Sequence, residues 1–159
     1  MKVKSTAEIA AIPDAKAKAN FPCSNRANFS SKSSRLGLPL RAQSNARKLA
    51  EKCQSLQAID EVLYSGQTGM LSLRLNKAYS VAKLLENLDI CIFAESLGGT
   101  ETLVTFPYTQ THVDMPDAEK DKRGIDEYLI RLSLGVENYE DIERDIIQAL
   151  DKAQIGEIV

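Results

Sequence analysis

The sequence predicts an α+β fold, with a small antiparallel or mixed sheet and helices on one face. Residues 70–75 and 128–134 repeat apolar side chains with period two, as half-buried strands do. Residues 46–53, and the segment from Asn138 onward, repeat them at the three-to-four-residue spacing of an amphipathic helix. Because each element has one apolar face, helices packed on one face of a sheet bury both kinds of face together.

Length and composition indicate one globular domain. The chain has 159 residues, of which 43% are hydrophobic and 26% are charged, as in ordinary domains that bury their own core. A formal net charge of -2 argues against nucleic acid or an anionic membrane as the partner, because both select basic surfaces. No segment has the roughly 20 apolar residues that cross a bilayer. We therefore expect a cytoplasmic chain.

Residues 1–35 differ in character from the rest and predict an N-terminal extension that is partly helical or disordered. Ser5 and Glu8 have the spacing of a capping box, which predicts a short helix. Pro13 removes the amide that the next helical turn would need. After Asn20 the chain is polar, basic and rich in serine, which is typical of a loop or a disordered segment.

Two strands joined by a turn follow the first amphipathic helix. Apolar residues predict strands over 59–64 and 70–75, and the glycines between them predict a turn over 65–69. Residues 77–87 then repeat valine and leucine at helical spacing, with Asn76 as the candidate N-cap.

The second half of the chain continues this alternation. Strands are expected over 90–93, 102–106 and 128–134, with a helix over 117–122 between the last two. A final helix has Asn138 as its N-cap and acidic residues in its first turn, where the helix dipole favours them. Its expected buried stripe consists of Tyr139, Ile142, Ile146, Ala149, Leu150 and Ala153.

The cysteines are expected to be structural. Cys23, Cys53 and Cys91 are an odd number and include no Cys-x-x-Cys pair. Cys53 lies on the apolar side of a predicted helix and Cys91 lies in the apolar run 90–93, so both are expected to be small buried hydrophobic residues. A catalytic thiol is not expected, because the single histidine belongs to none of these motifs.

The organising feature of the sequence is an arginine inside an apolar strand. Period two places Ile130, Leu132 and Leu134 on one face of this strand and Arg131 on the other. A buried guanidinium is costly unless it is paired, and its planar fork of donors suits a carboxylate held by two hydrogen bonds. From the spacing alone, a structural salt bridge to an acidic residue of the chain is the more ordinary explanation.

Residues 93–150 carry several motifs in a fixed order. They are Ala94-Glu95-Ser96-Leu97-Gly98-Gly99 with Glu101, Thr109-Gln110-Thr111-His112, Pro116 to Gly124, and Leu129-Ile130-Arg131-Leu132-Ser133-Leu134-Gly135-Val136-Glu137. Together they closely resemble the C-terminal end of the pyridoxal phosphate (PLP)-dependent enzymes of Cys/Met metabolism, the transsulfuration enzymes. Residues 106–116 are most similar to cystathionine γ-synthase and cystathionine β-lyase. The resemblance implies that residues 36–159 have the fold of the C-terminal small domain of PLP-dependent enzymes of the aspartate-aminotransferase fold.

The resemblance implies a substrate-binding role for four residues. Arg131 matches the arginine that grips the substrate's α-carboxylate, and Ser96 matches the serine of the Ser-Leu-Gly-Gly turn beside that carboxylate. Thr111 matches a threonine that lines the same pocket, and Glu95 matches a position at the pocket mouth associated with substrate choice. None of them is expected to be catalytic. On the residues alone, Ser96 could equally well cap a turn that the two glycines allow.

The resemblance implies PLP as cofactor, but its binding residues are not expected in this chain. A PLP enzyme needs a lysine for the Schiff base, an acid beside the pyridinium nitrogen and donors around the phosphate. In the family that lysine lies in a Ser-x-Thr-Lys signature followed by Gly-Gly-His-Ser, within a large domain. Lys32 follows Ser31, but Phe29 replaces the first serine of the signature and no Gly-Gly-His follows.

Two functions are open from the sequence. The first is a substrate-carboxylate-binding small domain of a PLP-dependent transsulfuration enzyme, which acts on a sulfur amino acid with a complementary large PLP domain or in a homo-oligomer, and is inactive alone. The alternative is a non-catalytic protein, derived from that domain, that self-associates or binds a partner and keeps Arg131 in a structural ion pair. A free-standing amino-acid sensor is a weaker third idea. His112, Asp114 and Asp117 are too few ligands to predict a metal site.

Overall fold

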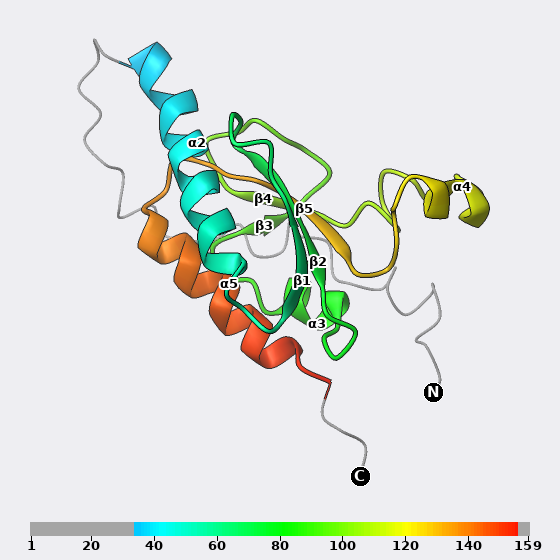
Figure 1. Ribbon diagram of the computed structural model, residues 1–159. Coiled ribbons are helices and arrows are strands. Elements are labelled where there is room, and N and C mark those ends of the chain that lie inside the picture. The colour runs from blue at the N-terminus through cyan, green and yellow to red at the C-terminus, as the bar shows by residue number, and fades with distance from the viewer. Residues whose placement is uncertain (1–33, 156–159) are drawn as a thin grey trace.

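The computed structural model describes residues 34–155, which form a five-stranded mixed sheet with helices beside it (Figure 1). The strand order is β1-β2-β5-β4-β3; β3 and β4 are parallel, and the other neighbouring strands are antiparallel. This arrangement confirms the predicted α+β class and shows that the sheet is mixed and not purely antiparallel. In chain order, the elements are α2 (Ser34–Cys53), β1 (Ile59–Leu63), β2 (Met70–Leu75), α3 (Val81–Glu86), β3 (Ile92–Phe93), β4 (Leu103–Thr105), α4 (Asp117–Lys122), β5 (Leu129–Ser133) and α5 (Tyr139–Ala153).

The alternation along β2 decides which face of the sheet is buried. Leu71, Leu73 and Leu75 are buried, whereas Ser72 and Arg74 lie on the opposite face and are half-buried. Helices α2, α3 and α5 cover the leucine face, as Figure 1 shows, while α4 lies apart from them. The helices share one core with the sheet, which confirms the prediction of helices on one face. The core includes Ala46, Leu49, Cys53, Val81, Leu84, Val104, Phe106, Ile130, Leu132, Leu134, Ile142, Ile146, Ala149 and Leu150.

Helix α2 begins earlier than the sequence pattern predicted. Its amphipathic repeat starts at residue 46, but the helix starts at Ser34, so the expected boundary between extension and domain falls inside it. Pro39 is close enough to the start that it removes a hydrogen bond to the first turn only. Leu40 is 62% exposed, and this end of the helix projects past the sheet (Figure 1). That end does not pack on the core, so its sequence lacks the apolar stripe by which a helix is predicted.

The predicted helix over 77–87 is wrong at its start. Helix α3 begins at Val81, and its N-cap is Ser80, whose hydroxyl accepts a hydrogen bond from the Lys83 amide at 3.3 Å. The side chain of Asn76, the expected N-cap, instead accepts from the Ala78 amide at 2.9 Å. Asn76 therefore closes a turn of its own before the helix, a common role of asparagine that sequence spacing does not separate from capping.

Strand β3 is shorter than the predicted strand over 90–93 because a buried aspartate of α5 binds the amides just before it. Asp145 is 3% exposed, and its carboxylate accepts hydrogen bonds from the amides of Asp89, Ile90 and Cys91 at 2.8 to 2.9 Å. Amides satisfied by a side chain are not available to a sheet ladder. Asp145 thereby attaches α5 to the edge of the sheet.

The remaining predictions agree closely with the structure. The strands over 59–64, 70–75, 102–106 and 128–134 and the helix over 117–122 form with small changes at their ends. Asn138 is the N-cap of α5. Five residues of the predicted α5 stripe are buried and the sixth, Tyr139, is partly buried against the core.

The two cysteines in the described part of the chain are free and buried, as expected. Burial raises the pKa of the Cys53 thiol to about 12 and raises the pKa of the Cys91 thiol well above its usual value. Both side chains therefore act as small core residues. Cys23, Lys32 and the helix predicted near Ser5 lie outside the described residues. Within residues 34–155, no helix is both long and apolar enough to span a bilayer.

Candidate functional site

Arg131 lies in the middle of the outer sheet face, the face opposite α2, α3 and α5. It belongs to the central strand β5, and its register partners are Ser72 on β2 and Thr105 on β4. Residues paired across antiparallel strands present their side chains on the same face, so Arg131 has a hydroxyl residue on each side. Its Nη2 donates a hydrogen bond to Thr105 Oγ1 at 3.3 Å.

Arg131 has no acidic partner within residues 34–155. The salt bridges of this part of the chain do not include it, although its side chain is half-buried. The structural ion pair considered from the sequence is therefore not found among the described residues. With one neutral hydroxyl as its acceptor there, the guanidinium retains donors for a carboxylate that comes from elsewhere.

The predicted turn at residues 96–99 lies beside the same face. Gly98 has a φ of 76°, a left-handed conformation that favours glycine. Its amide donates a hydrogen bond to the Ser133 hydroxyl at 2.8 Å. Ser133 is two residues from Arg131 in β5, so both side chains lie on the outer face. Ser96 itself is exposed, and the hydroxyl that holds Gly98 is that of Ser133.

A second hydroxyl holds the start of the segment that leads to this turn. Thr105 is 1% exposed, and its Oγ1 donates to the Ala94 carbonyl oxygen at 2.9 Å while it accepts from Arg131. Strand β3 ends one residue before Ala94, and Glu95 and Ser96 follow as exposed residues. The structure therefore places Arg131, Ser96 and Glu95 in one region.

Thr111 does not join this group in the described contacts. It is exposed, in the loop between β4 and α4, and its hydroxyl shares a hydrogen bond with His112 Nδ1 at 2.7 Å. No contact found within residues 34–155 connects it to Arg131 or to the turn at residues 96–99. In the same range, no group of three or more His, Cys, Asp or Glu side chains has an arrangement that could hold a metal ion.

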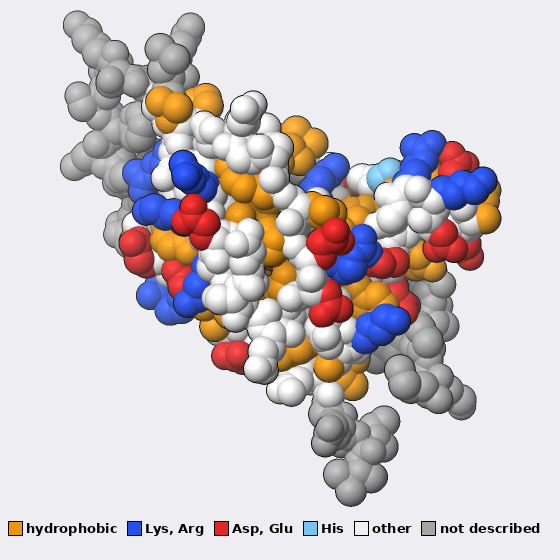
Figure 2. Space-filling view, in the orientation of Figure 1, with side chains coloured by type: hydrophobic (Ala, Val, Ile, Leu, Met, Phe, Trp, Pro, Cys, Tyr) orange, Lys and Arg blue, Asp and Glu red, His pale blue; other side chains and the backbone are white. Residues whose placement is uncertain are grey.

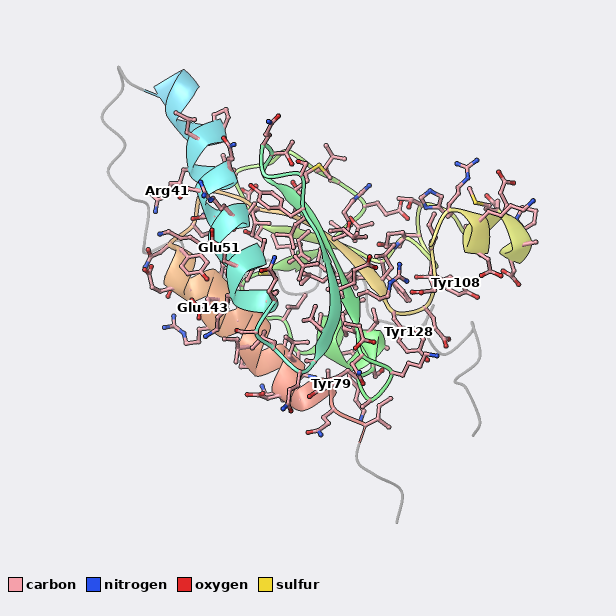
Figure 3. The ribbon with its side chains drawn as sticks, viewed as in Figure 1. Arg41, Glu51, Tyr79, Tyr108, Tyr128 and Glu143 are labelled. Atoms are coloured by element: carbon pink, nitrogen blue, oxygen red, sulfur yellow. The ribbon has the colours of Figure 1, made fainter. Side chains whose placement is uncertain are left out.

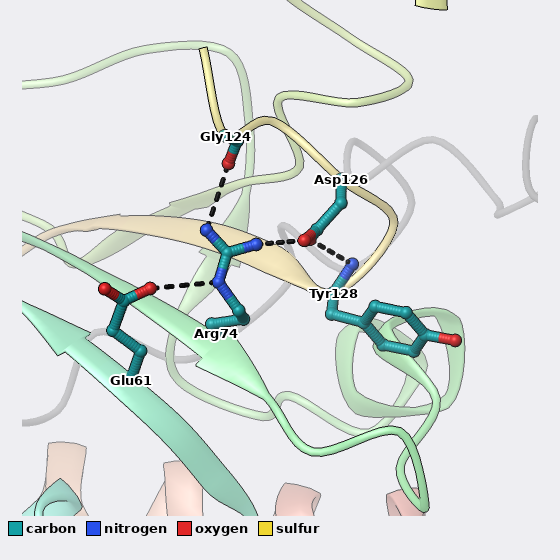
Figure 4. A network of polar contacts seen from close by, with 5 residues as sticks. All are labelled: Glu61, Arg74, Gly124, Asp126 and Tyr128. Carbon is teal, nitrogen blue, oxygen red and sulfur yellow. Dashed lines mark hydrogen bonds and ion pairs between the residues drawn. The ribbon is translucent and has the colours of Figure 1, made fainter. Parts of the chain in front are cut away.

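The loop between β4 and β5 is fixed to the outer face by Arg74 (Figure 4). The Arg74 Nε pairs with Glu61 at 3.0 Å, Nη1 pairs with Asp126, and Nη2 donates to the Gly124 carbonyl at 3.1 Å. Asp126 also accepts a hydrogen bond from the Tyr128 amide at 3.0 Å. All three nitrogens of this guanidinium are therefore occupied. The only sign of Arg74 in the sequence is its place on the polar side of a predicted period-two strand.

The segment that follows β5 closes tightly against the base of the turn. A Cβ added to Gly135 would lie 2.2 Å from the Thr100 carbonyl oxygen, so only glycine fits there. The Thr102 hydroxyl accepts from the Gly135 amide at 3.0 Å and donates to the Glu137 carboxylate at 2.9 Å. Asn45 of α2 donates to the Gly135 and Glu137 carbonyls at 3.1 Å each. The base of the turn is thus held by both the sheet and α2.

A cleft of about 390 Å³ opens beside this turn. It lies between α2, the connection from β1 to β2, and the end of β5. Its lining includes Gln43, Thr68, Gly98, Gly99 and Ser133. The predicted site residues Arg131, Ser96, Glu95 and Thr111 are not among the residues that line it.

Two lysines, Lys120 and Lys52, make contacts away from Arg131. Lys120 is 6% exposed, and its Nζ lies 4.5 Å from the centre of the Tyr108 ring; Figure 3 shows Tyr108 on the α4 side of the molecule. Lys52 pairs with Glu143 at 3.1 Å on the helix side.

On the face that Figure 2 shows, acidic and basic side chains are interspersed, which gives that face no basic stripe for nucleic acid.

Comparison with known proteins gives a match over most of the chain. The family described as Cys/Met metabolism PLP-dependent enzyme matches residues 38–151. The chain is 45% identical over 109 residues to the cystathionine gamma-synthase of Haemophilus influenzae, a match that covers 69% of this chain and 30% of that protein. It is 42% identical over 116 residues to the cystathionine gamma-synthase/O-acetylhomoserine (thiol)-lyase of Bacillus subtilis, with coverages of 73% and 31%. The chain thus spans about a third of the length of these relatives.

Solved structures give the same result for the fold. A cystathionine gamma-lyase from Lactobacillus plantarum, complexed with L-serine, has a TM-score of 0.71 at 26% identity, over 74% of this chain and 35% of that chain. A cystathionine gamma synthase from Xanthomonas oryzae, in complex with aminoacrylate and cysteine, has a TM-score of 0.67 at 27% identity, over 73% and 34%. Both are PLP-dependent transsulfuration enzymes of the aspartate-aminotransferase fold, which agrees with the predicted fold class.

Proposed function

The chain belongs to the Cys/Met metabolism PLP-dependent enzymes, and we propose that it is the substrate-carboxylate-binding small domain of a transsulfuration enzyme of that family. The small domain comprises residues 36–159, and residues 1–35 are an N-terminal extension to it. The substrate is a sulfur amino acid. Arg131 carries the proposal, because its half-buried guanidinium on the outer face has only a neutral hydroxyl acceptor among the described residues.

In this proposal the chain binds and orients the substrate. The planar guanidinium of Arg131 donates two parallel hydrogen bonds to the α-carboxylate. Ser96 adds a donor from the turn, and Glu95, exposed beside it, selects among substrates by the charge of their distal groups. Thr111 forms a further part of the pocket wall.

The cofactor belongs to another part of the enzyme. When bound, PLP supplies the electron sink that stabilises negative charge at the substrate's α-carbon. Two of the described lysines, Lys120 and Lys52, are engaged with Tyr108 and Glu143 and not with the outer face near Arg131. We therefore assign the Schiff-base lysine and the phosphate donors to a complementary large PLP domain, and we expect no turnover by the 159-residue chain alone.

The alternative is a non-catalytic protein that self-associates or binds a partner. It would keep Arg131 as one half of a structural ion pair, yet Arg131 has no acidic partner within residues 34–155. That observation favours the substrate-binding proposal over this one.

A hybrid enzyme tests the proposal. Residues 38–151 of this chain replace the matching part of the Haemophilus influenzae cystathionine gamma-synthase, and steady-state kinetics are measured with bound PLP. The variant Arg131→Lys keeps the positive charge but loses the two-pronged donor, so we expect kcat/KM to fall by about tenfold or more. An Arg131→Lys hybrid with unchanged kcat/KM would contradict the carboxylate-binding role.

A second measurement tests the assignment of the cofactor. The 159-residue chain is incubated with PLP and excess free lysine, reduced with borohydride, and weighed by intact mass spectrometry. We expect an unmodified chain or scattered partial labelling. A single stoichiometric adduct would mean that the chain builds its own cofactor site.

A further inference from the structure

We propose that Thr105 and Ser133 are positioning residues that set the spacing between Ser96 and Arg131. The inference rests on the proposed function, in which Ser96 and Arg131 bind the same carboxylate. Thr105 and Ser133 are 1% and 4% exposed, and the hydroxyl of each is hydrogen-bonded to the backbone of the chain itself. They act through hydrogen bonds at the two ends of the segment that carries Glu95 and Ser96.

Thr105 holds the beginning of this segment. Its hydroxyl donates to the Ala94 carbonyl at 2.9 Å and accepts from the Arg131 guanidinium at 3.3 Å. A hydroxyl has one proton to donate, so the bond to Ala94 uses that proton and presents the oxygen lone pairs to Arg131. One side chain therefore orients the guanidinium and also fixes the backbone just before Glu95.

Ser133 holds the end of the segment. Its hydroxyl accepts from the Gly98 amide at 2.8 Å, where the backbone adopts the left-handed conformation. Between the two anchors only residues 95–97 remain, and all three are exposed. A connection this short has little freedom once both of its ends are fixed.

The sheet register makes both anchors local to Arg131. Thr105 is the cross-strand partner of Arg131, and Ser133 is two residues along the same strand. The position of Ser96 relative to Arg131 is therefore set by two hydrogen bonds to rigid strands. Binding groups have to be held within about 0.5 Å of their productive geometry to work together. The two hydroxyls hold Ser96 and Arg131 in this way.

Amide hydrogen exchange in the 159-residue chain tests the Ser133 anchor without any enzyme activity. We expect Ser133→Ala to speed the exchange of the Gly98 amide by about tenfold or more, because the amide loses its acceptor. The amides of β2 and β5 should keep their rates. Ser133→Thr keeps a hydroxyl and should restore slow exchange at Gly98. Equal Gly98 exchange in the native chain and in Ser133→Ala would overturn the role of Ser133.

Kinetics of the hybrid enzyme test the Thr105 anchor. Thr105→Val removes the hydroxyl at nearly constant shape, and we expect KM to rise about three- to tenfold, the effect of one lost neutral hydrogen bond, while kcat changes less. Thr105→Ser keeps the hydroxyl and should stay near the parent. Ile146→Val is the matched control, because it removes a buried methyl group from the helix-covered side and should lower Tm without raising KM.

Arg131→Ala separates this inference from the proposed function. If Arg131→Ala leaves KM unchanged, the carboxylate-binding role itself fails. If Arg131→Ala raises KM but Thr105→Val and Ser133→Ala act no more strongly than Ile146→Val, only the positioning role fails. A double variant adds a check: once Ser96→Ala has removed the positioned hydroxyl, Thr105→Val should raise KM by a smaller factor than it does alone.

Discussion

Arg74 and Arg131 lie on the same outer face of the sheet, on the neighbouring strands β2 and β5, but their surroundings differ. Arg74 faces Glu61 across the sheet and also binds Asp126 and the Gly124 carbonyl. Arg131 faces Ser72 and Thr105 and has one hydrogen bond to a neutral hydroxyl. Within residues 34–155, the Arg74 guanidinium is therefore paired to acidic groups of the chain, whereas the Arg131 guanidinium is bonded to a hydroxyl only.

The difference shows how strand register assigns roles to identical side chains. A cross-strand neighbour is close enough to satisfy a guanidinium, so an acid opposite Arg74 makes it a structural tie for the loop between β4 and β5. The Thr105 hydroxyl orients Arg131 without neutralising its charge. Arg131 is consequently the arginine of this pair that remains able to bind an external carboxylate.

The largest contrast is expected in activity. In the hybrid enzyme, Arg131→Ala should lower kcat/KM by about 100-fold or more, because the loss of two charge-assisted hydrogen bonds to the carboxylate amounts to about 3 kcal/mol or more. Arg74→Ala should lower it by less than about threefold, since its partners belong to the chain. Comparable losses of kcat/KM in both variants would erase the distinction between the two arginines.

The second contrast concerns stability and has the opposite order. Arg74→Ala should reduce the free energy of unfolding by about 1 to 2 kcal/mol, because it leaves Asp126 and the Gly124 carbonyl without their partner. Arg131→Ala should change it by less than about 1 kcal/mol. Urea unfolding of the 159-residue chain, followed by circular dichroism, measures both. A larger loss in Arg131→Ala than in Arg74→Ala would indicate that Arg131 has a structural partner.

A third variant converts the surroundings of Arg131 into those of Arg74. Ser72→Asp places an acid directly across from Arg131, where it competes with the substrate carboxylate. We expect KM of the hybrid to rise by about tenfold, with a stability gain of about 0.2 to 1 kcal/mol. Ser72→Asn has a similar shape and no charge, and should keep KM near the parent. Equal KM values for the two variants would argue against a free guanidinium at Arg131.

The smallest effect is expected from salt. Glu61 and Asp126 are 47% and 40% exposed at their side chains, so screening should weaken their pairing with Arg74. Raising NaCl from about 0.05 M to about 0.5 M should reduce the unfolding free energy of the chain by about 0.5 kcal/mol or less. Salt should change the unfolding free energy of Arg74→Ala less than that of the native chain. An equal change in both would mean that the ion pairs of Arg74 do not cause the salt dependence.

Several tertiary contacts lay beyond the reach of sequence reasoning. Asp145 accepts hydrogen bonds from three amides at residues 89–91, which are more than 50 positions away in the chain. No periodicity in the sequence predicts such a contact, and it shortens the strand expected over 90–93. Helix α3 is capped by Ser80 and not by Asn76, because both residues can close a turn and their spacing in the sequence does not show which one precedes the helix. The sequence does not predict the contacts of Thr105 and Ser133, because a hydroxyl in a strand gives no sign of its partner until the turn is placed beside it.

The sequence by itself determined the α+β class, the family, and the face on which Arg131 lies. Period-two and helical repeats record local geometry and burial, and the motifs around Ser96 and Arg131 are contiguous. Only the tertiary structure decided that Arg74 is internally paired while Arg131 is not, and that two hydroxyls hold the turn beside Arg131. Those outcomes depend on strand register and loop placement, which bring together residues distant in the chain, and a one-residue shift in register would change every such neighbour.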